Sequence, residues 1–430
     1  MSPPMSHPPP SLSPAEQAVQ TLRDPAEIRR RCAAIAAHVS DGSSPHFTLD
    51  RSRLPAVAAR IAKLSLARFP TLRIPYHSRW RHFEAGGVDR AARLDQALQG
   101  LGAPEAARAR IDLTVVSVLL DAGAGPAWRY QEPETDAILT RSEGLAVASF
   151  DAFLSGQFSS DPDQPCRVDA PALLALQPWH LATIFQVHDG NPLVGLEGRT
   201  DLMHRLGASL AAHARQEGGP ARPGRLYDLL LARLDPATRS LQAADILRSL
   251  LDTTSAIWPS GQWLGRRDGS GPEDQPLGDV WPHPAAGGQG LDAGRVPFHK
   301  LSQWLSYSLL EPFEWAGVPV TGLDALTGLP EYRNGGLLLD AGVLLPRDAA
   351  TLGQAHTPAD PWVIEWRALT VALLDELAPL VRAELGVTAE QLPLACMLEG
   401  GSWAAGRQIA AERRLGGPPP VRIDSDGTVF

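Results

Sequence analysis

The sequence predicts a mainly α-helical protein with a few short strands. Apolar residues recur at helical spacing along most of the chain, and several of these segments follow a Ser or Asp cap and a proline. Only FTLD at 47–50 and AILTR at 137–141 have the composition of strands. The sequence contains no internal repeat and no heptad run that would indicate a solenoid or a coiled coil.

The helical segments are expected in a regular order along the chain. They lie at 13–39 (two helices divided at Asp24), 51–70, 105–123, 198–216, 225–234, 296–317 and 362–385. The segment at 105–123 is apolar on nearly every face, so we expect it to lie in the interior.

The chain is expected to form one large folded unit behind a short tail. Residues 1–20 begin with a Pro/Ser-rich stretch and are expected to be a disordered tail. Residues 21–430 are enough for a single large, mostly helical domain or for two tightly packed subdomains. Loops are expected at 155–172 and 215–224.

A third loop, at 259–295, is long and rich in Gly and Pro. Loops of this length are usually functional lids or spacers. Trp263, Trp281 and His283 within the loop favour a partly packed lid.

The composition narrows the class of protein. Lys and Arg number 39 against 48 Asp and Glu, a net charge of −9 that does not favour nucleic acid as a partner. The sequence shows no membrane span and no signal peptide, and its three cysteines form no disulfide framework. We therefore expect a cytoplasmic protein that does not bind membranes.

Charged residues stand in the apolar stretch ALTGLPEYRNGGLLLDAG. Glu331, Tyr332 and Arg333 follow a Gly-Leu-Pro turn and precede an apolar run. Buried charges are costly unless they are paired or used. Two interpretations remain open from the residues alone: an Arg–Glu pair that braces a turn, or a functional acid.

Two further segments combine polar residues with a helical core pattern. On the helix that begins near Pro297, His299 and Gln303 share a face away from the Trp304 stripe, which suits a polar pocket or a solvated side. Glu365 and Arg367 interrupt an apolar helix at a spacing that prevents their pairing with each other. We expect their partners to be Arg333 and Glu331.

Other candidate residues are more scattered. His77 and His82 are five residues apart, which is a poor spacing for a metal pair on one helix face. Asp121 ends an apolar helix shortly before Trp128, and Glu143 stands where a helix could start. No phosphate-binding loop, metalloprotease motif or dinucleotide fingerprint is present, so no cofactor is expected.

Six runs of the sequence resemble the uracil-catabolism protein family of fungi and bacteria, its fourth component, also called the uracil-regulated protein family. They are IPYHSRWRHFEAGGVDR, SVLLDAGAGPAWRY, RSEGLAVASF, NPLVGLEGR, VPFHKLSQWLSYSLLEP and TGLPEYRNGGLLLD. The resemblance covers nearly the whole chain. It implies a place in a pathway that degrades uracil through a nucleotide and a ribosylurea-type intermediate to urea.

The order of motifs is also similar to that of the queuosine-nucleotide N-glycosidases. PFHKLSQ matches a Lys-x-x-Gln helix start, LPEYRNGG an Asp-Tyr-Arg segment and VIEWRAL a Glu-x-Arg helix. In this sequence Glu331 replaces the acid of that family and His299 replaces an aromatic residue. The similarity implies a helical fold related to helix-hairpin-helix DNA glycosylases, with DALTGLPEYRNGG as the hairpin.

The two resemblances together imply an N-ribosyl hydrolase with Glu331 as its catalytic carboxylate. Residues implied to bind the substrate are Lys300, Gln303, His299, Tyr332, Arg333, Asp121, Trp128, Glu143, Glu365 and Arg367. Lys300 and Arg333 would bind a 5′-phosphate if the substrate carries one.

Two alternatives stay open. One is a metal-dependent amidohydrolase of the same pathway, for which His77, His82 and Asp121 are the only plausible ligands. The other is a non-catalytic binding or scaffold protein. The sequence does not determine the oligomeric state.

Overall fold

Helices form most of the structure. The computed structural model describes residues 12–121, 123–259, 261–266, 271 and 274–424. The α-helices are α1 (Pro14–Arg23), α2 (Pro25–Ser40), α3 (Leu54–Arg68), α4 (Trp80–Phe83), α5 (Arg90–Ala97), α6 (Ala103–Leu119), α7 (Arg141–Leu154), α8 (Ala170–Ala175), α9 (Pro178–Ile184), α10 (Leu196–Glu217), α11 (Arg225–Leu231), α12 (Ala243–Thr254), α13 (Lys300–Trp315), α14 (Tyr332–Asp340), α15 (Pro361–Leu385), α16 (Leu394–Met397) and α17 (Trp403–Arg413). The predicted mainly α class is confirmed.

The strands are short and form pairs. They are β1 (Phe47–Leu49), β2 (Tyr130–Gln131), β3 (Ile138–Leu139), β4 (Leu241–Gln242), β5 (Gln262–Leu264), β6 (Gln275–Gly278), β7 (Val280–Pro282), β8 (Arg295–Pro297), β9 (Val320–Thr321), β10 (Leu344–Pro346), β11 (Ala355–His356) and β12 (Arg422–Ile423). β1 pairs antiparallel with β10, and β3 pairs antiparallel with β2. The two strands predicted from the sequence are therefore present.

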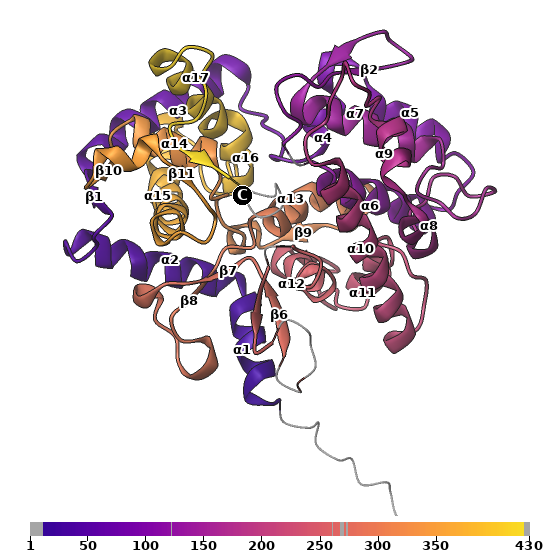
Figure 1. The fold of residues 1–430 in the computed structure, drawn as a ribbon, viewed down its shortest axis with the longest axis horizontal. Coiled ribbons are helices and arrows are strands. Elements are labelled where there is room, and N and C mark those ends of the chain that lie inside the picture. The colour runs from indigo at the N-terminus through magenta and orange to yellow at the C-terminus, as the bar shows by residue number, and fades with distance from the viewer. Residues whose placement is uncertain (1–11, 122, 260, 267–270, 272–273, 425–430) are drawn as a thin grey trace, which may run out of the picture.

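The helices gather in two groups, with α13 between them. In Figure 1, α2, α3, α14, α15 and α17 lie on the left, and α4 to α9 lie on the right. α15 packs against α2 and α3, while α13 packs against α6 and α12. One continuous cluster of buried apolar side chains includes residues from both groups. The division into one domain or two subdomains stays a prediction.

The first helix starts at the predicted Ser13 cap, inside the stretch 1–20 that was also expected to be a tail. Ser13 accepts the backbone N–H of Glu16, and the Glu16 carboxylate accepts the backbone N–H of Ser13, so a capping box begins α1 at Pro14. Residues 14–20 are therefore helical, and the tail predicted for residues 1–20 extends too far into the folded chain. Residues 1–11 lie outside the described residues.

The described part of the predicted lid, 259–295, contains strands. β5 pairs with β6, and β7 pairs with β8, both antiparallel. Residues 260, 267–270, 272 and 273 lie outside the described residues. A role of this segment as a lid stays a prediction.

The helix-hairpin-helix expected at DALTGLPEYRNGG is not confirmed. Only a single 3₁₀ turn, Leu323–Ala325, precedes the Gly-Leu-Pro segment, so the first helix of the hairpin is missing. The chain then runs extended because Tyr307 and Gln303 on α13 hydrogen-bond to Thr327, at 2.7 and 2.9 Å. These contacts fix the approach to α14 without a helix.

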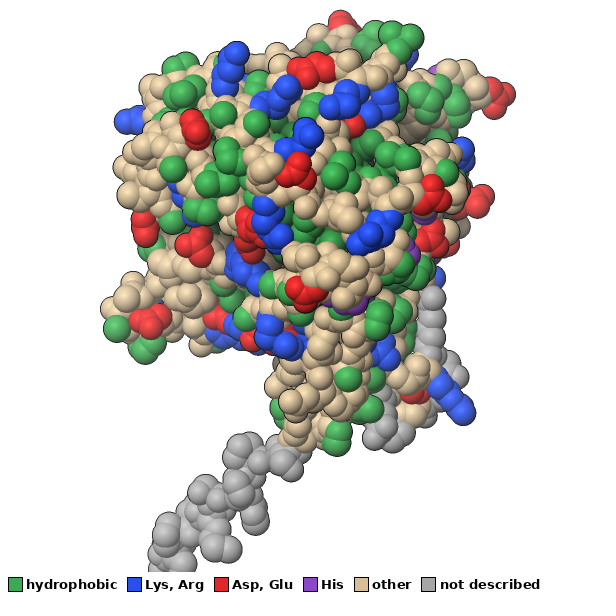
Figure 2. All heavy atoms as spheres, turned by 90° about the vertical axis from the view of Figure 1, so that its left-hand side faces the viewer, with side chains coloured by type: hydrophobic (Ala, Val, Ile, Leu, Met, Phe, Trp, Pro, Cys, Tyr) green, Lys and Arg blue, Asp and Glu red, His purple; other side chains and the backbone are tan. Residues whose placement is uncertain are grey.

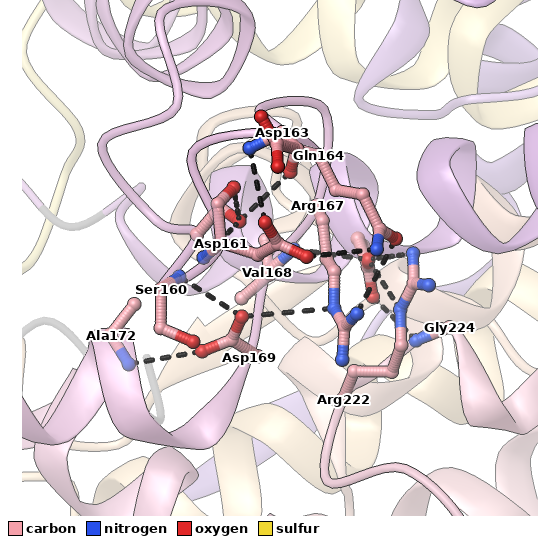
Figure 3. Close-up of polar contacts among 12 residues, drawn as sticks. Ser160, Asp161, Asp163, Gln164, Arg167, Val168, Asp169, Ala172, Arg222 and Gly224 are labelled. Atoms are coloured by element: carbon pink, nitrogen blue, oxygen red, sulfur yellow. Dashed lines mark hydrogen bonds and ion pairs between the residues drawn. The ribbon is translucent and has the colours of Figure 1, made fainter.

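The predicted loop at 155–172 is closed by its own carboxylates. Asp169 accepts the backbone N–H groups of Ser160 and of Ala172, each at 3.0 Å, and so begins α8 (Figure 3). Asp161 accepts the Gln164 side chain at 2.9 Å. The carboxylates of Asp161 and Asp169 are therefore used in local structure.

A buried aspartate on α6 fastens this loop and the next one. Oδ1 of Asp112 accepts the backbone N–H of Gly224 at 2.6 Å, and Oδ2 accepts that of Val168 at 3.0 Å and Arg222 Nη2 at 2.5 Å. Burial raises the pKa of Asp112 to about 6, although Arg222 opposes this effect. The buried network makes both loops part of the fixed scaffold.

The surface carries charges of both signs. On the face shown in Figure 2, Lys and Arg side chains alternate with Asp and Glu side chains among apolar ones. Within the described residues, every helix is too short or too polar to cross a membrane.

Candidate functional site

A large cavity lies where the two groups of helices meet. Its volume is about 810 Å³, within the range of roughly 300–1,000 Å³ usual for small-molecule sites. The lining residues are His77, His82, Asp121, Gly123, Ala124, Gly125, Arg141, Ser142, Val194, Gly195, Lys300, Leu301, Trp304, Leu329, Glu331, Tyr332, Trp403, Pro418, Pro419, Val421, Arg422 and Ile423.

Several helices begin at this cavity. The first residues of α7, α13 and α14 line it, as does Gly195, which precedes α10. Helix starts present unpaired N–H groups and a positive partial charge. Side chains of the cavity wall are therefore set in a field that favours carboxylates and other anionic groups.

Glu331 is the carboxylate at the start of α14. Oε1 accepts the backbone N–H of Asn334 and Oε2 that of Arg333, both at 2.6 Å. Glu331 is 8% exposed and lines the cavity. Burial raises the pKa of Glu331, while the two backbone hydrogen bonds and the charge of Lys300 oppose the rise. The side chain thus caps a helix and also faces the cavity.

Lys300 and Tyr332 lie on the same cavity. Lys300 is the first residue of α13, and its backbone N–H donates to Asp279 at 3.0 Å. Burial lowers the pKa of Lys300, while the charges of Glu331 and Asp121 oppose this shift. Tyr332 is 38% exposed and begins α14.

Asp121 lies at the end of α6 beside an arginine that sequence reasoning did not select. Its Oδ2 is 3.0 Å from Nη1 of Arg79, which is fully buried. Arg79 also donates to Ser117 at 2.7 Å. Asp121 was expected in the site, and the structure places it there. The dense run of His and Arg at 77–82 was the available signal for Arg79.

Buried polar atoms that lack a hydrogen-bond partner among the described residues lie at the bottom of the cavity, on three lining residues and on Arg79, which contacts the lining residue Asp121. They are Asp121 Oδ1, Arg79 Nη2, His82 Nδ1 and Trp304 Nε1. Arg79 lies 5.9 Å from the Trp304 ring, and the His82 ring is 5.7 Å from it, so these groups are neighbours. Buried polar groups are almost always hydrogen-bonded. We call these four residues the polar floor, and its free donors and acceptor suit a polar ligand or water.

The two histidines at 77 and 82 do not form a metal pair. Nδ1 of His77 lies 2.9 Å from Oε2 of Glu399, whereas His82 packs edge-on against Trp304. Burial lowers the pKa of His82 to about 4. Among the residues that the structure describes, no three His, Cys, Asp or Glu side chains form a group that could hold a metal ion.

Gln303 and His299 lie behind the cavity wall. Gln303 is fully buried and binds Thr327, as described above. His299 precedes α13 with a φ of 48°, and its Nε2 donates to the carbonyl of Leu22 at 2.9 Å. Neither residue is among those that line the cavity. Both side chains brace neighbouring segments in this structure, and their contact with substrate stays a prediction.

Glu365 and Arg367 have other partners than predicted. Arg367 forms two hydrogen bonds with Asp279, at 2.8 and 2.7 Å, and both residues are buried. Glu365 accepts the hydroxyl of Ser44 and lies 3.4 Å from His283. The expected pairing with Arg333 and Glu331 is therefore wrong, and Glu365 and Arg367 belong to a structural network.

Three more predicted residues do not line the cavity. Trp128 is fully buried, and its Nε1 donates to the carbonyl of Phe185 at 2.8 Å. The Arg333 guanidinium donates to the carbonyl of Gly417 at 3.0 Å, and it is the Arg333 backbone N–H that binds the Glu331 carboxylate. Glu143 lies in the first turn of α7, where Arg141 and Ser142 line the cavity instead.

Comparisons with known proteins cover nearly the whole chain. Residues 21–430 match the family described as "Protein of unknown function (DUF1688)". The protein named "Uracil catabolism protein 4" of Lachancea kluyveri is 39% identical over an alignment of 420 positions, which covers 91% of this chain and 93% of that protein. "Protein urg3" of Schizosaccharomyces pombe is 40% identical over 411 residues, 94% of this chain and 97% of that protein.

Proposed function

The chain belongs to the family described as "Protein of unknown function (DUF1688)", and on that basis we propose that it acts in uracil catabolism as an N-ribosyl hydrolase. Its substrate would be a ribosylurea-type intermediate or the 5′-phosphate of that compound. The bond cleaved would be the C1′–N bond between ribose and the ureido group. The pathway comes from the printed name of one relative, which covers nearly all of both chains.

One observation carries the choice of reaction. Glu331 presents a buried carboxylate to a cavity whose floor contains polar atoms without a partner among the described residues. Cleavage of a ribosyl C1′–N bond builds positive charge on the sugar ring, and a nearby carboxylate stabilises this charge. A ribose ring with its hydroxyl groups supplies the donors and acceptors that the polar floor lacks.

Glu331 can activate a water molecule as well as stabilise the positive charge on the sugar ring. Each of its oxygens accepts one backbone N–H and retains further acceptor capacity. Burial raises the pKa of the carboxyl, which moves it toward the range where a general base works best at neutral pH. Glu331 would orient a water molecule toward C1′ and take its proton.

Asp121 and Lys300 would hold the substrate. The free Oδ1 of Asp121 is an acceptor for a ribose hydroxyl, and Arg79 keeps the other oxygen occupied. Lys300 lines the cavity and its charge opposes the rise in the pKa of Glu331, so it would bind a 5′-phosphate if one is present. Arg333 is a weaker choice for this role, because it does not line the cavity and its Nη1 donates to the carbonyl of Gly417.

A non-catalytic binding protein is the second candidate function. The polar floor favours it as much as it favours catalysis, because the unpartnered atoms indicate a ligand and not a reaction. Turnover separates these two functions. A metal-dependent amidohydrolase finds no support in the ligand set, since His77 is hydrogen-bonded to Glu399 and Asp121 is paired with Arg79.

The test is to incubate the purified protein with ribosylurea and with its 5′-phosphate and to measure urea and the released sugar by mass spectrometry. We expect urea and sugar in equal amounts, and activity that survives a chelator. Glu331→Gln is the control and should bind the substrate without turning it over. Tight binding with no urea release from the wild type would establish the binding function instead.

A further inference from the structure

A histidine hydrogen-bonded to a carboxylate lies on the cavity wall. His77 lines the cavity, and its Nδ1 is 2.9 Å from Oε2 of Glu399. Both side chains are 13% exposed, so the pair is largely shielded from solvent. A hydrogen bond between imidazole and carboxylate in a cavity is an arrangement that enzymes use to orient a proton donor or acceptor.

The pair has a defined proton arrangement. Burial would raise the pKa of Glu399, but the hydrogen bond with His77 and the charge of Arg68 outweigh burial and lower it. An ionised carboxylate can only accept, so Nδ1 of His77 must carry the proton in this hydrogen bond. Nε2 is then the nitrogen left for the cavity, and no hydrogen bond joins it to another described residue.

The backbone on both sides of the pair is held firmly. The His77 N–H donates to the carbonyl of Ala395 at 3.0 Å. Glu399 lies in a π-helical turn, Leu398–Ser402, a form that is rare and frequent at functional sites. A Cβ at Gly401 would lie 2.5 Å from the carbonyl oxygen of Ile61, so only glycine lets this turn pack so closely on α3.

The reaction proposed above needs a proton on the departing nitrogen. A ureido nitrogen is a poor leaving group as an anion, and Glu331 in its carboxylate form cannot supply a proton while it accepts one from water. General acid assistance is worth about 10²–10⁴ in rate. His77 and Glu331 line the same cavity, and their charges interact.

We infer that His77, oriented by Glu399, is the general acid that protonates the leaving nitrogen. This inference rests on the proposed N-ribosyl hydrolase activity. His77 acts in its imidazolium form, with one proton on Nδ1 bonded to Glu399 and a second proton on Nε2 facing the cavity. The C1′–N bond breaks with its electron pair going to nitrogen, and the Nε2 proton of His77 joins that nitrogen, which leaves a neutral imidazole with its proton on Nδ1. Water adds to C1′ and gives its proton to Glu331. Ribosylurea and water thus yield ribose and urea, and return of the proton from Glu331 to His77 restores the enzyme.

The experiment compares two substrates that differ in their need for an acid. Ribosylurea requires protonation of its leaving group, whereas p-nitrophenyl β-D-ribofuranoside releases a phenolate that departs without it. We expect His77→Gln to lower kcat on ribosylurea by about 10²–10⁴ and kcat on the p-nitrophenyl compound by less than about tenfold. Glu331→Gln should lower both rates, because it acts on C1′ and water.

Glu399→Gln tests the positioning role of the carboxylate. It should lower the rate on ribosylurea more than the rate on the p-nitrophenyl compound, whereas a purely structural role would lower both equally. His213→Gln is a matched control, because this histidine binds the Ser209 carbonyl within α10 and does not line the cavity. Melting temperatures of all variants report whether they fold. If His77→Gln does not fold, Glu399→Gln serves as the test in its place.

The possible outcomes separate the two proposals. A wild type that cleaves ribosylurea while His77→Gln loses equal activity on both substrates would overturn the role of His77 alone. A wild type that cleaves neither substrate would overturn both the hydrolase function and the acid. The selective loss on ribosylurea supports both.

Discussion

Ser402 donates its hydroxyl to Oδ1 of Asn334 across 2.9 Å, and both side chains are buried. Asn334 also donates its backbone N–H to Glu331, while Ser402 ends the π-helical turn that carries Glu399. One side-chain hydrogen bond therefore connects the start of α14 to the turn beside His77. This contact sets the position of the Glu331 carboxylate relative to Glu399, the partner of His77.

The first prediction concerns Glu331→Gln. The substitution removes the negative charge that would oppose the developing charge on the sugar, so turnover should fall by roughly a hundredfold or more. The helix cap is weakened as well, and the free energy of unfolding should fall by about 1 kcal/mol. Turnover and melting temperature are measured on the same sample.

Glu331→Asp provides the matched comparison. Aspartate caps helices well, so this variant should regain most of the stability while its shorter side chain leaves turnover impaired. A Glu331→Gln protein that melts early but keeps its activity per folded molecule would show that Glu331 only caps α14.

The second prediction concerns Arg367→Met. This substitution leaves Asp279 buried without its ion-pair partner, so the free energy of unfolding should fall by about 3–5 kcal/mol. Adding Asp279→Asn should restore part of the loss, because the buried charge is then gone. Denaturant titrations of the single and double variants measure both effects. A stable Arg367→Met protein that binds substrate poorly would show that Arg367 takes part in substrate binding.

The third prediction distinguishes phosphorylated from unphosphorylated substrate. Lys300→Met keeps the length of the side chain but removes its charge. Loss of a hydrogen bond to a charged group costs about 1.5–3 kcal/mol, so KM for the 5′-phosphate should rise by roughly 10- to 150-fold. KM for ribosylurea should change little, and Lys300→Arg should retain much of the phosphate affinity. Equal effects on the two substrates would exclude Lys300 as the phosphate ligand.

The fourth prediction concerns pH. Burial lowers the pKa of His299 from 6.5 to about 4, although its bond to Leu22 opposes this. As pH falls, the unfolded chain takes up this proton first, so the stability from this group is complete above about 6.5 and is lost as pH falls toward 4. The full loss corresponds to roughly 3 kcal/mol.

His299→Asn tests this dependence. Asparagine tolerates the left-handed backbone found at this position, with a φ of 48°, and does not titrate in this range. Urea denaturation at pH 7.5 and pH 4.5 should show a smaller loss of stability in His299→Asn than in the wild type. An equal loss of stability between pH 7.5 and pH 4.5 in the two proteins would mean that another group controls the stability at acid pH.

Local signals predicted the helices well and the partners of charged residues poorly. Asp24 and Pro25 mark the start of α2, and Ser13 marks that of α1, because caps act within a few residues. Glu331 was placed at a helix start for the same reason. Asp279, the partner of Arg367, lies 88 residues away in a stretch without a local pattern. Contacts between distant segments leave no spacing in the sequence.

Whether a predicted residue lines the cavity depends on how local the signal for its position is. Lys300 and Tyr332 begin helices whose starts converge on the cavity, so a local prediction of a helix start was enough. Trp128 and Gln303 sit on segments near the cavity but point into the packed interior. The direction of a side chain depends on the segments that pack against it, and these segments cannot be identified from local sequence patterns.

The pairing of β1 with β10 joins Phe47 to Pro346, and the cavity wall is drawn from residues between His77 and Ile423. Contacts between such distant segments require large loops to close and slow the folding of a chain. Helical circular dichroism should therefore recover first when the denatured protein is diluted into buffer. The capacity to bind substrate should appear only in a later kinetic phase, when the two groups of helices dock.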